Sequence, residues 1–117
     1  MNTGMNGYDK EEALAFILRR INPKDHESLA DRIEDLVRQA IDADIAFMHE
    51  TGVLDEEGNG GDAYYEEDDA FEYIVEKLAA DNDLTPGQAV KTAALVDDFF
   101  DAQMAYMAYA GLVQDDD

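Results

Sequence analysis

Two polar residues stand on apolar helical faces, and they are the first candidates for chemistry. At 100° per residue, Asp44 falls near the middle of a face marked by Val37 and Phe47. Gln103 holds the matching place beside Tyr106. Burying a polar group alone costs about 1–3 kcal/mol, so we expect Asp44 to bond to Gln103 or to a tyrosine hydroxyl. The alternative is that Asp44 and Gln103 line a ligand pocket between helical hairpins.

The second candidate is an acidic, glycine-rich segment at residues 55–66, which suggests a cation site. Asp55, Asn59, Gly60 and Glu66 occupy positions one, five, six and twelve of a twelve-residue stretch. An EF-hand calcium loop carries an acid or amide, a glycine and a glutamate at these positions, so the spacing resembles such a loop. A calcium-like site is therefore one function that this sequence allows.

Two departures weaken the calcium interpretation. Position three is Glu57, which is longer than the usual Asp or Asn, and position eight is Asp62, where an EF-hand has an apolar residue. No second loop of this kind occurs to pair with it. A plain acidic linker is the favoured interpretation, and we assign no metal ligands.

Catalytic signals are weak. His26 and His49 have no serine or cysteine nucleophile beside them in the sequence, and both are expected at the surface. The chain contains no phosphate-binding loop and no dinucleotide fingerprint. We therefore expect neither a cofactor nor an enzyme, and an enzyme is the least favoured function.

The elements that position these residues come from an internal duplication. Residues 36–53 and 95–112 align at an offset of 59, and seven of the eighteen pairs are identical. Residues 8–21 match 65–78 at an offset of 57, beginning with Tyr8 and Tyr65. Each copy reads as a short helix, a turn, a long helix and a glycine stop.

Periodicity and capping signals predict four helices. The first covers about 10–21 after Asp9 as N-cap, and the second runs from between 23 and 28 to 51. The third covers about 67–80. The fourth runs from 86 to about 110 behind the capping box of Thr85 and Gln88. Gly52 and Gly111 are expected to end the long helices in the left-handed conformation.

These elements predict an all-α fold, a four-helix bundle built from two tandem hairpins. Residues 1–7 are expected to be a disordered tail, and 8–117 a single domain. Within it, repeat one covers 8–58, a Gly-rich linker covers 58–62, and repeat two covers 65–117. Two copies are too few for a solenoid, so the hairpins should close on each other about a pseudo-twofold axis.

The long helices also carry an apolar flank beside their core face. Its six members repeat at the same offset: Ile41, Ile45, Met48, Phe100, Met104 and Met107. The flank either packs on the short helices or contacts another chain, because methionine and aromatic residues are frequent in such contacts. We predict that part of it forms an interface with a protein partner or a second copy.

Charge narrows the function further. The chain has 29 acidic and 8 basic residues, a formal net charge of −21. This excludes direct nucleic-acid binding through a basic patch and disfavours an anionic membrane. Since the sequence has no cysteine and no apolar N-terminal run, we expect a cytoplasmic protein. The leading prediction is a non-catalytic acidic interaction or regulatory protein that presents carboxylates to a basic partner, as in mimicry of a nucleic acid.

Overall fold

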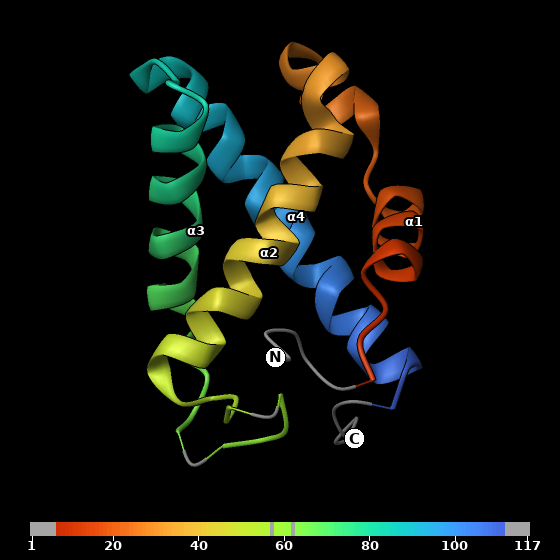
Figure 1. The fold of residues 1–117 in the computed structure, drawn as a ribbon. Coiled ribbons are helices and arrows are strands. Elements are labelled where there is room, and N and C mark those ends of the chain that lie inside the picture. The colour runs from red at the N-terminus through yellow and green to blue at the C-terminus, as the bar shows by residue number, and fades with distance from the viewer. Residues whose placement is uncertain (1–6, 57, 62, 112–117) are drawn as a thin grey trace.

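The computed structural model describes residues 7–56, 58–61 and 63–111, and all regular secondary structure in these ranges is helical (Figure 1). The elements in chain order are α1 (Lys10–Arg20), the 3₁₀ segment η1 (Pro23–Arg32), α2 (Ile33–Thr51), α3 (Glu67–Asp81) and α4 (Pro86–Tyr109). The prediction of an all-α fold is confirmed. The predicted tail at the N-terminus, apart from Gly7, lies outside the described residues.

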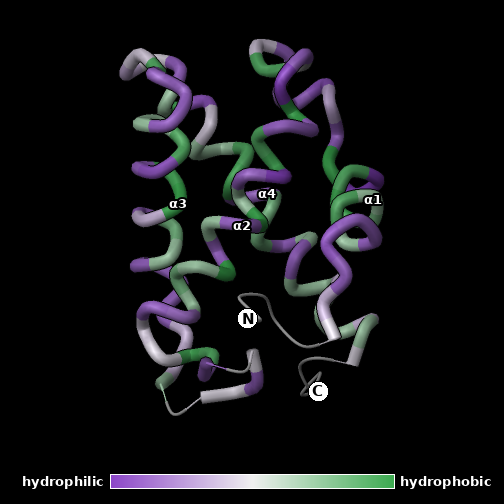
Figure 2. The backbone as a smooth tube through the Cα atoms, in the orientation of Figure 1, coloured by the Kyte–Doolittle hydropathy of each residue, from purple (hydrophilic) through white to green (hydrophobic). Residues whose placement is uncertain are grey.

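The two long helices form the centre of the molecule. Figure 1 shows α2 and α4 crossing each other, with α1 on one side of the crossing and α3 on the other. Each short helix contacts both long helices. Apolar residues turn toward this shared interior, as the green segments of the tube show (Figure 2). In this fold the polar faces of the helices therefore point outward, and the apolar faces of α2 and α4 pack together.

The helix ends follow the local signals of the sequence. The side chain of Asp9 accepts hydrogen bonds from the backbone of Glu11 and Glu12, and Thr85 forms the predicted capping box. Gly52 ends α2 in the left-handed conformation at φ 86°. The carbonyl of Met48 accepts its bond from the amide of Leu54 at 3.0 Å, one residue later than a Schellman ending requires.

The predicted start of the second long helix is wrong. The chain forms η1 over Pro23–Arg32, capped by Asn22, and α2 begins only at Ile33. His26 leaves helical geometry at φ −134° and ψ 42°. Its ring nitrogen lies 2.6 Å from the carboxylate of Asp98 on α4. His26 is thus buried rather than at the surface, and this contact between distant residues accompanies the break in the helix.

Within the part of the chain that the structure describes, no helix combines the length and the apolar character that a membrane span would need.

Candidate functional site

A buried network of hydrogen bonds joins the two long helices. Asp44 on α2 and Gln103 on α4 are 2% and 3% exposed. The Gln103 amide donates to Asp44 Oδ2 at 3.0 Å, and the Tyr65 hydroxyl donates to Asp44 Oδ1 at 2.6 Å. The Tyr8 hydroxyl donates to Gln103 Oε1. Both partners that the sequence suggested for Asp44, a glutamine and a tyrosine, therefore bond to it.

Burial is the main cause of the pKa shifts in this hydrogen-bonded group. Desolvation raises the pKa of Asp44 above its usual range, and the hydrogen bonds from Tyr65 and Gln103 oppose that rise. Desolvation also raises the pKa of Tyr65 and of Tyr8, and the charge of Asp44 adds to both shifts. Both phenols are therefore neutral hydrogen-bond donors at physiological pH.

A pocket of about 430 Å³ opens beside this polar network. Asp44, Gln103 and Tyr65 form one hydrogen-bonded wall, and the exposed carboxylates of Glu67 and Asp101 line the pocket as well. The remaining surface is mainly apolar and comes from α2, α4 and the segment after α2, namely Met48, Val53, Leu54, Phe100, Met104 and Met107. The volume lies in the range of small-molecule sites, roughly 300–1,000 Å³.

The apolar flank is mostly part of the interior. Five of its six members are at most 8% exposed within the single chain: Ile41, Ile45, Met48, Phe100 and Met107. The prediction that the flank faces another chain is therefore wrong for these five. The rings of Phe71 on α3 and of Tyr65 lie 6.4 and 6.5 Å from that of Phe100, and the amide of Leu54 donates to the carbonyl of Met48 at 3.0 Å. Met104 is 52% exposed and lines the pocket.

The segment proposed as a calcium loop folds into a tight turn. The amide of Asp55 donates to the carbonyl of Asn59 at 2.8 Å, and Asp55 Oδ1 accepts from the Asn59 amide at 2.9 Å. Leu54 and Gly60 form an isolated antiparallel bridge. Among the described residues no three acidic or histidine side chains gather as a metal site, and Glu57 and Asp62 of the predicted loop lie outside that part of the chain.

Gly61 anchors this turn against the end of α2, and we predict that it tolerates no side chain. A Cβ at Gly61 would lie 2.2 Å from the carbonyl oxygen of Gly52, which is fixed backbone. Gly61→Ala should therefore lower the free energy of unfolding by about 1–3 kcal/mol, the usual cost of overpacking. Urea denaturation followed by circular dichroism measures the change.

Gly60 provides the matched control for that substitution. A Cβ at Gly60 would meet nothing within 4 Å. Gly60→Ala should change the free energy of unfolding by less than about 0.5 kcal/mol, as is usual for an exposed site. Equal stability of the two alanine variants would show that the turn does not press on Gly52.

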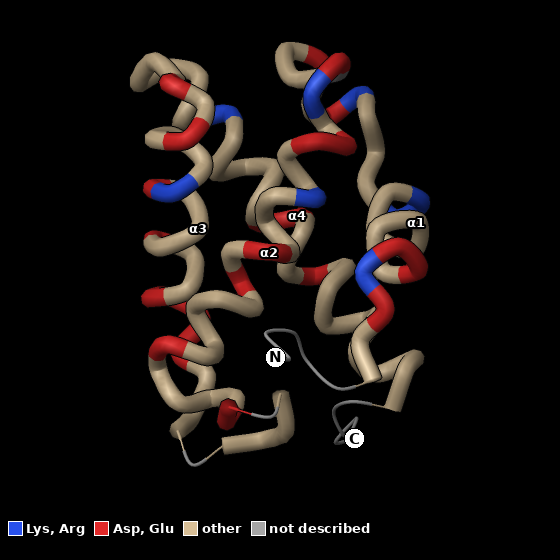
Figure 3. The backbone as a smooth tube through the Cα atoms, viewed as in Figure 1, with Lys and Arg blue, Asp and Glu red and all other residues tan. Residues whose placement is uncertain are grey.

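The end of the molecule that contains the pocket is acidic. Residues 39–76 include thirteen Asp and Glu and no Lys or Arg, and residues 92–117 also lack Lys and Arg. Figure 3 shows red segments on α3, on the lower part of α2, in the middle of α4 and on the loop below α2, with most blue segments on α1, η1 and the upper turns. Lys10 and Arg38 form ion pairs at 2.7 Å with Asp42 and Glu11.

Sequence reasoning found part of this site. It identified Asp44 and Gln103, and it aligned Tyr8 with Tyr65 without giving either hydroxyl a role. The offsets of 57 and 59 carried that signal, because equivalent tyrosines bond to equivalent polar residues. Glu67 and Asp101 were missed, since nothing in an acidic sequence distinguishes two carboxylates that a fold brings to one pocket.

Comparison with family models, with curated proteins and with solved structures found no match to this chain.

Proposed function

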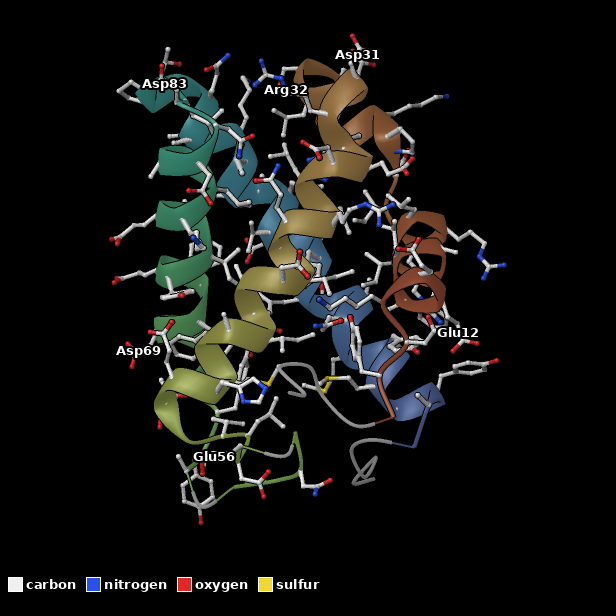
Figure 4. All side chains as sticks on the ribbon, viewed as in Figure 1. Glu12, Asp31, Arg32, Glu56, Asp69 and Asp83 are labelled. Carbon is white, nitrogen blue, oxygen red and sulfur yellow. The ribbon has the colours of Figure 1, made fainter. Side chains whose placement is uncertain are left out.

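We propose that this chain is a non-catalytic binding protein that recognises a basic protein partner through its acidic end. The observation that supports this most directly is the absence of Lys and Arg from residues 39–76, which hold thirteen acids. Exposed carboxylates of this segment include Glu56 and Asp69, which point away from the helices at the lower end of Figure 4. The excess charge is thus concentrated, not spread evenly.

Such a surface acts mainly on encounter and specificity. A patch of one sign attracts a partner of the opposite sign over about one Debye length, roughly 8 Å at physiological salt. Complementary charge increases the association rate and excludes like-charged partners. A basic nucleic-acid-binding protein is one such partner, because surface carboxylates would occupy the positions of the phosphates of its nucleic acid. A homodimer is less favoured, since two copies at −21 each repel one another.

We also propose that the fold is a duplicated helical hairpin, because contacts recur between the two halves. Tyr8 packs edge-on against Tyr106 at 5.1 Å, and Tyr65 packs edge-on against Phe47 at 6.1 Å. The offsets of 57 and 59 map the first pair onto the second. The hydrogen bonds of the same two tyrosines, to Gln103 and Asp44, follow the same mapping.

A second aromatic contact supports the same duplication. Phe16 lies 5.5 Å from Tyr106, and Tyr73 lies 5.4 Å from Phe47. In each case the short helix of one half packs on the long helix of the other. These reciprocal contacts fit four helices in one domain that includes 8–111, with the pseudo-twofold axis between Asp44 and Gln103.

The proposed function predicts salt-sensitive binding of a basic peptide. A fluorescein-labelled octa-arginine peptide should bind at low salt. Its affinity should fall by roughly tenfold as the salt concentration rises to the physiological value and screens the interaction. Fluorescence anisotropy measures the dissociation constant. Binding that ignores salt, or the same affinity for an octa-glutamate peptide, would contradict the proposal. Displacement of the chain by duplex DNA in competition for a DNA-binding domain would support mimicry.

A further inference from the structure

We propose that the pocket beside Asp44 binds a small organic cation, an ammonium group carried on an apolar body. The proposal rests on three features of the pocket: the hydrogen-bonding state of its polar wall, the charge around it and the chemistry of its apolar walls. It is separate from the basic protein partner proposed above, which would contact the exposed carboxylates of the same end of the molecule.

The tyrosine hydroxyls and one N–H of the Gln103 amide already donate hydrogen bonds within the polar wall. The Tyr65 hydroxyl donates to Asp44 at 2.6 Å and the Gln103 amide donates to Asp44 at 3.0 Å. Gln103 Oε1 already accepts from Tyr8. The carboxylate oxygens of Asp44 retain lone pairs, because each accepts up to two hydrogen bonds. Apart from the second N–H of the Gln103 amide, this wall offers acceptors, so a ligand that bonds to the Asp44 carboxylate must bring the donor.

The charged side chains that line the pocket are all acidic. Glu67 and Asp101 line it together with Asp44, and no Lys, Arg or His lines it among the described residues. A carboxylate, phosphate or nucleotide ligand would meet three acidic side chains and no cation. An ammonium group would meet the opposite charge in a partly desolvated site, where ionic hydrogen bonds are stronger than in water. The pocket therefore selects cations over neutral molecules and rejects anions.

The apolar walls set the rest of the ligand. Met48, Met104 and Met107 contribute flexible thioether side chains, and Phe100 contributes an aromatic ring. Unbranched methionines adapt to different ligand shapes. Since the volume is about 430 Å³, the body of the ligand has the size of a small aromatic or alkyl group. Met104, which is half-exposed, stands at the mouth and can be changed without disturbing the core.

Three probes that share one apolar body test the proposal: 4-phenylbutylamine, 4-phenylbutan-1-ol and 4-phenylbutyrate. The chain is labelled with ¹³C at its methionine methyl groups, and each signal is assigned by a Met→Leu substitution. We expect the amine to shift the signals of Met48, Met104 and Met107 in a saturable way. It should bind about tenfold more tightly than the alcohol at low salt, the ratio that one hydrogen bond to a charged group supplies.

Variants with matched charge locate the effect. Glu67→Gln combined with Asp101→Asn should reduce amine binding about tenfold and leave alcohol binding unchanged. Glu27→Gln combined with Asp31→Asn removes the same charge from η1 and should leave the amine unchanged. Met104→Trp should weaken all binding by filling the mouth. Equal binding of the three probes, or no shift of the methionine signals below about 1 mM amine, would overturn the proposal.

Discussion

Replacing Tyr106 with alanine should lower the free energy of unfolding by about 3–5 kcal/mol, the cost of removing a large buried aromatic side chain. Tyr106 is fully buried on α4, and its ring packs edge-on against Tyr8 at 5.1 Å and Phe16 at 5.5 Å. Domains of this size are stable by only about 5–15 kcal/mol. The variant should therefore lose much of its stability, which urea denaturation followed by circular dichroism measures.

Two further substitutions serve as controls. One removes only the hydroxyl of Tyr106, and the other removes an exposed tyrosine side chain. Tyr106→Phe keeps the ring and loses a 3.0 Å hydrogen bond to Glu12, and phenylalanine already stands at the equivalent position 47. We expect this variant to lose less than about 1.5 kcal/mol. Tyr64→Ala, at a side chain that is 89% exposed, should have almost no effect. A Tyr106→Ala variant as stable as Tyr64→Ala would contradict the packing described for α1 against α4.

Removing the acceptor at the centre of the buried polar network should have the second largest effect. Asp44→Ala leaves the Tyr65 hydroxyl and the Gln103 amide without their partner in a buried site. An unsatisfied buried donor costs about 1–3 kcal/mol, and losing a desolvated charge returns part of that cost. The free energy of unfolding should therefore fall by about 2–3 kcal/mol in a urea titration. A stabilised Asp44→Ala variant would mean that the burial of charge outweighs the two hydrogen bonds.

The raised pKa of Asp44 adds a pH dependence with a defined sign. Because the folded chain holds this proton to higher pH than the unfolded chain, the contribution of Asp44 is most favourable below the unfolded pKa, about 3.9. It is lost as pH rises through the folded pKa. Asp44→Asn cannot lose a proton, so its stability relative to the original chain should increase with pH above about 4. A constant difference across that range would show that Asp44 ionises normally.

The sequence predicted the elements whose signals are local. Asp9 and Thr85 cap helices through bonds that reach three residues, and Gly52 ends α2 because the chain needs a left-handed residue there. The break at His26 was not predictable in this way. Its partner Asp98 lies 72 residues away in the sequence. Only the folded chain therefore shows that α2 begins at Ile33 and not near Pro23.

The site divides along the same line. Asp44 stood out because a carboxylate on an apolar face needs a partner, and the duplication pointed to Gln103 in the equivalent place. The apolar flank was misjudged because its cover depends on tertiary packing. Tyr65 and the loop around Leu54 lie over residues that helical periodicity alone leaves uncovered. No local pattern predicts a pocket whose walls come from three helices and a turn.

The most direct test of a localised acidic binding surface compares two triple variants that lose the same charge. One replaces Glu56, Asp69 and Glu72 with Gln, Asn and Gln, all within residues 39–76, which contain no Lys or Arg. The other removes the same number of charges at Glu27, Asp31 and Asp83, as Gln, Asn and Asn, and Asp31 and Asp83 mark the opposite end of the molecule (Figure 4). All six side chains are exposed, so neither variant should lose its fold.

The measurement is the dissociation constant of octa-arginine for both variants at one low salt concentration, with circular dichroism confirming equal helicity. If the acidic end is the binding surface, the first variant should bind octa-arginine roughly tenfold more weakly. Each lost contact contributes about 0.5 kcal/mol to that change. The second variant should stay within about twofold of the original chain. Equal weakening in the two variants would show that only net charge matters, and it would contradict a binding surface at this end.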